Sequence, residues 1–129
     1  MGTVEQAIRA QFFSTPVTLQ TLGQGKPFVL DRIDRNGIVL LLGKQRNYTP
    51  LSWDCLEGIV PFLRRQPGWV RAGGTYVVGG ERGTLDEHLK DCISRQTSRW
   101  VAVVLQEAGI VRVGKGPPLR VQLTDGSER

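Results

Sequence analysis

The feature that most constrains the fold of this chain is a pair of apolar runs joined by a short polar turn. Residues 28–33 (FVLDRI) and 38–42 (IVLLL) flank the turn 34–37 (DRNG). Asn-Gly readily adopts the positive φ angles that a tight connection between antiparallel strands requires. The sequence therefore predicts a β-hairpin. The alternating segment 16–22 adds a third strand, so residues 16–47 are expected to form a small antiparallel meander.

Four other segments have apolar residues at helical spacing. Thr49 and Pro50 have the residue types of an N-cap and a first helical position, which places one helix start there. Thr84 and Glu87 match a capping box, and Gly109 suits the end of the last helix. The predicted helices cover residues 4–13, 50–65, 84–92 and 96–108.

Short strands are predicted at residues 69–72, 75–78, 110–113 and 119–123, and a basic turn joins the last two. From residue 49 the order is helix, strand, short helix, turn, longer helix, strand, turn, strand. Together with the segments 84–89 (TLDEHL), 97–101 (TSRWV) and 105–111 (LQEAGIV), this order resembles the winged-helix variant of the helix-turn-helix.

The fold class expected from this resemblance is α+β. A winged helix-turn-helix core carries an N-terminal helix and a small antiparallel β-meander. Residues 1–48 form the N-terminal extension in this interpretation, residues 49–124 the winged-helix domain and residues 125–129 a tail.

The resemblance implies binding of double-stranded DNA. In such domains the second helix packs one face on the core and presents its N-terminal outer face to the major groove, while the hairpin contacts the backbone or minor groove. The expected DNA-binding residues are Arg95, Gln96, Thr97, Ser98 and Arg99 from the helix, and Arg112, Lys115 and Arg120 from the hairpin.

The charge of the chain agrees with a polyanionic partner without establishing one. The chain has seventeen Lys and Arg residues and twelve Asp and Glu residues, which gives a net charge of +5. Residues 1–50 and 88–129 each carry a net +3, whereas residues 51–87 carry −1. Most of the basic residues are arginines, which suit phosphate and guanine but also accumulate in chains from GC-rich genomes.

Three roles remain open at this stage. The chain is expected to act as a transcription regulator or as the recognition module of a larger DNA-processing system, alone, as a homodimer or in a larger complex. A winged helix can instead dock another protein. Tyr48 and Trp69 flank predicted turns and would allow a third role, stacking on a modified base or on single-stranded nucleic acid.

Catalysis is not expected. Asp31 and Asp34 lack the further acid and lysine of a nuclease site, and His88 is predicted to be a surface residue without a thiol or carboxylate partner. With one histidine and two cysteines, the sequence predicts no metal site and no cofactor. This chain could still be the binding domain of a larger enzyme.

The remaining expectations concern location. The sequence has no apolar run long enough to span a membrane and no signal peptide, so a cytoplasmic protein is predicted. Cys55 and Cys92 are accordingly expected as reduced thiols that pack as small core side chains.

Overall fold

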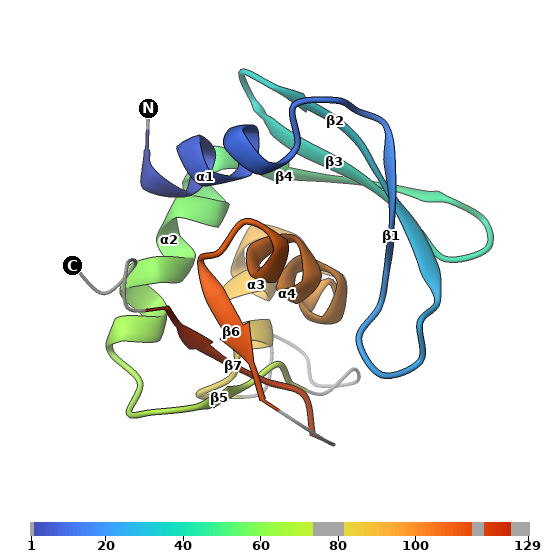
Figure 1. Cartoon of the computed structure of the whole chain (residues 1–129). Coiled ribbons are helices and arrows are strands. Elements are labelled where there is room, and N and C mark those ends of the chain that lie inside the picture. The colour runs from blue at the N-terminus through green and yellow to red at the C-terminus, as the bar shows by residue number, and fades with distance from the viewer. Residues whose placement is uncertain (1, 74–81, 115–117, 125–129) are drawn as a thin grey trace.

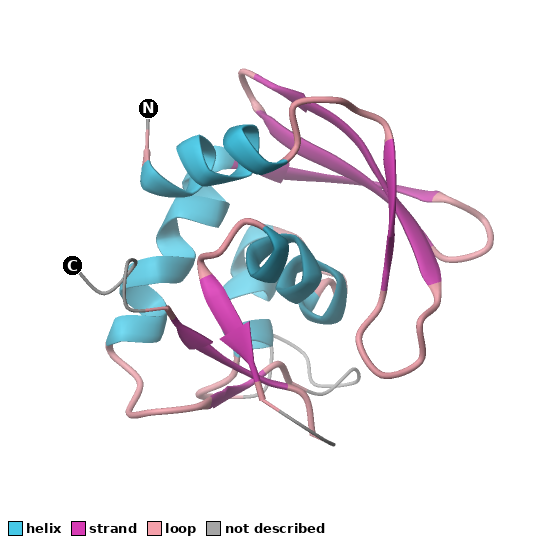
Figure 2. Ribbon diagram, in the orientation of Figure 1, coloured by secondary structure: helices cyan, strands magenta, loops and turns pink. Residues whose placement is uncertain are grey.

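The computed structural model describes residues 2–73, 82–114 and 118–124, which form a mixed α+β fold. Four helices accompany two antiparallel sheets (Figures 1 and 2). In chain order the elements are α1 (Thr3–Gln11), β1 (Val17–Gln20), β2 (Pro27–Asp34), β3 (Gly37–Leu42), β4 (Asn47–Ser52), α2 (Trp53–Arg64), β5 (Val70–Arg71), α3 (Leu85–Cys92), α4 (Ser98–Glu107), β6 (Val111–Val113) and β7 (Arg120–Leu123).

The predicted hairpin is confirmed as β2 and β3, within a sheet of order β1-β2-β3-β4. The Asp34 carboxylate accepts hydrogen bonds from the amides of Asn36 (2.8 Å) and Gly37 (3.2 Å), which holds the turn. Gly37 has a φ of +151°, and a Cβ there would collide with the carbonyl oxygen of Leu51 on β4. Glycine is therefore required both for the turn and for the close approach of the next strand.

One face of this sheet packs on the helices. Leu30 on β2, Leu40 on β3 and Leu51 on β4 are each 2% exposed or less, and the polar side chains alternate with them toward solvent. β3 is an inner strand with neighbours on both sides. This explains why its run of apolar residues is almost wholly buried.

The expected helix start at Thr49 and Pro50 is wrong. Both residues lie in β4, where Thr49 pairs with Leu40 and Pro50 with Val39. Since β4 is an edge strand, a proline without an amide proton is tolerated there. The helix begins three residues later, at Trp53, and the Ser52 hydroxyl caps it by accepting a hydrogen bond from the Cys55 amide at 3.1 Å. The proposed division between residues 48 and 49 falls inside this strand.

The second half of the chain adds helices α3 and α4 and a sheet of order β5-β7-β6. In Figure 1 the two helices lie between the two sheets. The predicted 84–92 helix is present, but the Thr84 side chain makes no cap hydrogen bond, and Glu87 accepts from the Gly83 amide at 2.9 Å. α4 begins at Ser98, two residues later than expected, because residues 93–97 form the connection from α3. Gly109 follows it with a φ of +77°.

Several expectations lie outside the described residues: the strand at residues 75–78, Lys115 and the tail at residues 125–129. Among the helices that are described, none is long and apolar enough to cross a membrane. The longest, α2, has 12 residues and spans about 18 Å, against the ~30 Å of a bilayer core.

The N-terminal helix is attached to α2 by a carboxylate that sequence patterns do not reveal. Glu57 accepts hydrogen bonds from the amides of Val4 (3.0 Å) and Glu5 (2.8 Å), in the first turn of α1. A carboxylate in this position satisfies free amides and interacts favourably with the helix dipole. Apolar packing of Val4 and Ile8, both fully buried, completes the attachment.

We expect Glu57→Ala to lower the free energy of unfolding by about 1–3 kcal/mol, because two partly buried amides lose a charged acceptor. Denaturant unfolding measures this loss. The control Asp91→Ala removes an exposed carboxylate and should change stability by no more than about 0.5 kcal/mol. Equal effects of the two substitutions would show that the Glu57 contacts contribute nothing specific.

Candidate functional site

The exposed face of the β5-β7-β6 sheet carries three arginines. Val70, Val111 and Val121 alternate inward to the core, which turns Arg71, Arg112 and Arg120 outward. Arg71 lies directly opposite Arg120 in the strand register, and Arg112 lies opposite Gln122. The outward placement predicted for Arg112 and Arg120 is confirmed. We call this surface, Arg71, Arg112, Arg120 and Gln122, the arginine face.

The electrostatics of the arginine face suit an anionic ligand. Like charges directly opposite on neighbouring strands destabilise a sheet, and the three strands contain no acidic residue. The Arg112 guanidinium lies 5.6 Å from the centre of the Trp69 ring and donates to the Gln122 side-chain oxygen through Nε (3.0 Å) and Nη2 (2.6 Å). Trp69 is 44% exposed, so a ligand could contact its ring and the Arg112 guanidinium at the same place.

A pocket of about 330 Å³ continues the arginine face to the start of α4. Arg71 belongs to both surfaces, and Gln96, Ser98 and Arg99 line the pocket together with Pro118 and Leu119. Arg99 is exposed, and its guanidinium lies 5.8 Å from the centre of the Trp100 ring. The first-turn amides of a helix attract anions, and here two arginines line the same pocket.

The structure separates the residues that the helix was expected to present together. Thr97 and Ser98 are wholly buried, and their hydroxyl groups have no hydrogen-bond partner within the described part of the chain, so the expectation that they face solvent is wrong. Arg95 is exposed, but it precedes α4 and donates to the Tyr48 carbonyl oxygen on β4 at 3.0 Å. Gln96 and Arg99 lie beside the arginine face, in the pocket that Arg71 also lines.

The body of α4 is enclosed, which the sequence interpretation did not anticipate. Residues 101–105 are all buried. α1, α3 and β6 contact the helix, and the segment from β1 into the following turn lines a pocket together with Val103 and Glu107. This face of α4 is therefore bordered by the N-terminal part of the chain.

Tyr48 is 54% exposed, as a stacking role requires, but it lies on the other sheet. Its hydroxyl accepts a hydrogen bond from Arg32 at 3.0 Å, and the Arg32 guanidinium is 5.9 Å from the ring centre. Tyr48 and Trp69 thus belong to separate surfaces, each with its own arginine.

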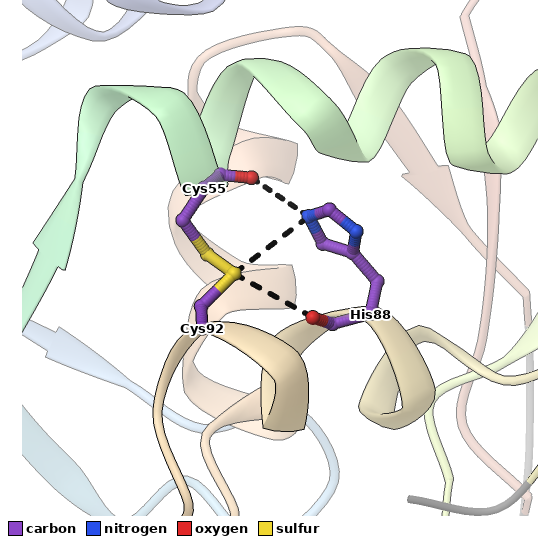
Figure 3. A group of neighbouring side chains, drawn as sticks. All are labelled: Cys55, His88 and Cys92. Atoms are coloured by element: carbon purple, nitrogen blue, oxygen red, sulfur yellow. Dashed lines mark hydrogen bonds between the residues drawn. A yellow bond between two sulfur atoms is a disulfide. The ribbon is translucent and has the colours of Figure 1, made fainter. Parts of the chain in front are cut away.

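The two cysteines and the only histidine form a second group (Figure 3). Cys55 on α2 and Cys92 on α3 are joined in a disulfide, with 5.9 Å between their Cα atoms, so the prediction of two reduced thiols is wrong. His88 was expected to lie free on the surface, yet its Nε2 is 2.8 Å from the Cys55 carbonyl oxygen and 4.0 Å from Cys92 Sγ. All three residues line a cavity of about 670 Å³.

Sequence reasoning missed Arg71 and this cysteine–histidine group for different reasons. Arg71 follows the same valine-inward, arginine-outward alternation as Arg112 and Arg120, so the predicted strand 69–72 contained a usable signal. Cys55 lies 37 residues from Cys92 on another helix, and only the packing of α2 on α3 brings them together.

Comparison with protein-family models, with curated proteins and with solved structures finds no match to this chain.

We expect Cys55→Ser/Cys92→Ser to lower the free energy of unfolding by about 2–4 kcal/mol, because the disulfide closes a loop of this length in the unfolded chain. Denaturant unfolding of the oxidised protein measures the change. A reductant should reduce the stability of the wild-type chain by a similar amount and leave the double variant unaffected. A wild-type chain indifferent to reductant would contradict the prediction.

Proposed function

We propose that the chain binds double-stranded DNA through the arginine face and the adjoining start of α4, as a regulator or as the recognition module of a DNA-processing system. The observation that carries the proposal is the gathering of Arg71, Arg112 and Arg120 on one exposed sheet face that continues to Arg99. Guanidinium groups suit phosphate because they form planar, paired hydrogen bonds with its oxygens.

A winged-helix arrangement of residues 53–124 is part of the proposal. The order α2, β5, α3, α4, β6, β7, with antiparallel sheet order β5-β7-β6, supports it. The connection between β6 and β7 then corresponds to the wing. Arg112 and Arg120 flank that connection on the two strands that would lie along the DNA backbone.

The enclosure of α4 determines which mode of binding we propose. With residues 101–105 buried, the helix cannot lay its length in the major groove without displacing the N-terminal extension. Contacts from the arginine face would then fall mainly on phosphates, which position a protein but carry little sequence information. Base contacts would be limited to Gln96 and Arg99.

A single-stranded ligand is the second candidate, because Trp69 exposes its ring beside Arg112. Exposed aromatic rings within a basic surface are typical of single-strand binding. A protein-docking role has less support. Phe13, Tyr48 and Trp69, the large apolar side chains exposed in the described part of the chain, come from three separate segments.

The first test is a salt titration of binding to duplex DNA, single-stranded DNA and RNA. If four arginines contact phosphates of a duplex, the logarithm of the affinity should fall with the logarithm of salt with a slope of about −3 to −4. Arg112→Ala/Arg120→Ala should make that slope shallower by about 2.

The matched control for this test is Arg35→Ala. Arg35 is exposed in the β2–β3 turn. This turn lies near the start of α2, since the indole nitrogen of Trp53 donates a hydrogen bond to the Asp34 carbonyl oxygen at 2.8 Å. The arginine face lies beyond the other end of that helix (Figure 1). Loss of the same slope in Arg35→Ala would indicate a general charge effect, and salt-independent affinity would refute DNA binding. Tighter binding of single strands would favour the second candidate.

The contribution of α4 is tested with Arg99→Ala and Gln96→Ala. If Arg99 reads a base, Arg99→Ala should cost about 1–3 kcal/mol of binding and relax the preference at one position of the site. A uniform loss across DNA sequences would assign Arg99 to a phosphate instead. Unchanged affinity in the double variant would remove the start of α4 from the interface.

A further inference from the structure

The group formed by Cys55, His88 and Cys92 has the geometry of a metal site as well as of a disulfide. One ligand atom from each residue lies within 4.8 Å of the other two. His88 and Cys92 are four residues apart on α3 and therefore share one face of that helix. Cys55 comes from the first turn of α2, where the helix dipole stabilises an anionic ligand.

The position of the histidine ring depends on a glycine inside α2. A Cβ on Gly58 would lie 2.8 Å from His88 Cε1, so any other residue would displace the imidazole. Glycine in a helix interior lowers stability by roughly 0.5–1 kcal/mol relative to alanine. At position 58 it leaves the space that the imidazole of His88 occupies. The ring of Phe62 also packs against the imidazole of His88, with 5.6 Å between the two ring centroids. The imidazole is thus held against the sulfur atoms by the surrounding side chains.

We propose that the reduced chain binds one zinc-class divalent ion through Cys55 Sγ, Cys92 Sγ and His88 Nε2, and that the disulfide is the oxidised form of this site. Two thiolates and one imidazole are a ligand set that zinc accepts, with a fourth position left for water. The cavity beside the group provides that open position, lined by Ser52 and Asp54 among others. This inference does not depend on the proposed DNA binding.

A dithiol or a phosphine can reduce the Cys55–Cys92 disulfide and so prepare the site for the ion. Two electrons and two protons convert the Cys55–Cys92 disulfide into two thiols while the reductant is oxidised. Binding of the ion then releases those two protons as the thiols become thiolates. The proton on His88 Nε2, now donated to the Cys55 carbonyl oxygen, moves to Nδ1 and leaves Nε2 free to coordinate.

The test is a Co²⁺ titration of the full chain, reduced with a phosphine and kept free of oxygen. We expect one Co²⁺ per chain, a thiolate-to-cobalt charge-transfer band and the strong visible bands of a tetrahedral ion, all lost on addition of Zn²⁺. The oxidised wild-type chain should show none of these bands. Absence of the charge-transfer band in the reduced chain would overturn the proposal.

Variants assign the three ligands. Cys92→Ser changes an exposed residue, so the fold should survive and the charge-transfer band should be lost or strongly weakened. Asp91→Asn, its exposed neighbour, should bind Co²⁺ as the wild type does. His88→Gln keeps both thiolates and should lower the affinity by about tenfold or more, as even indirect partners of metal ligands do. An unchanged Co²⁺ spectrum and affinity in Cys92→Ser or His88→Gln would exclude that residue and overturn the site.

Discussion

The burial of five consecutive residues on α4, Val101 to Leu105, is the constraint on which the rest of the structure depends. A helix buried along one stripe needs one neighbour, but a helix buried over successive residues must be covered on several sides. α1, α3 and β6 contact the helix, and the segment from β1 into the following turn borders it across a pocket. Leu30 and Leu40 of the meander belong to the same apolar core as these α4 residues, so the meander is an integral part of the fold.

Helix α2 connects these parts through three different interactions. Glu57 holds the first turn of α1, Cys55 is bonded to α3, and Gly58 leaves room for His88. The helix also contacts β7, which carries Arg120 and Gln122 of the arginine face, and its end at Leu63 and Arg64 lines a pocket with Gln122. A change at the cysteine–histidine group, by reduction or by metal binding, would therefore act on the helix that joins the meander to the proposed DNA-binding surface.

The accuracy of sequence reasoning varied with the range of the interaction concerned. The Asn36-Gly37 hairpin was predictable because the turn and its flanking strands are local. The helix start at Thr49-Pro50 was wrong although the residue types were suitable, because pairing with β3 extends β4 to Ser52. Thr49 and Leu51 are buried and the residues beside them are exposed, which is the period-2 pattern of a strand. A strand over these residues is consistent with a helix cap at Ser52.

The sequence by itself determined which segments form helices, though not where α2 begins, together with the hairpin and the inward and outward alternation of Val and Arg in the last strands. These features follow from local periodicity and turn chemistry. The sequence could not determine that Thr97 and Ser98 are buried, that Arg95 reaches Tyr48, or that Cys55, His88 and Cys92 meet. Those facts depend on how α2, α3 and α4 pack against one another and against the two sheets, and side chains far apart in the chain become neighbours only through that packing. The arginine face lies between these cases: alternation turns each arginine outward, and strand pairing places them side by side.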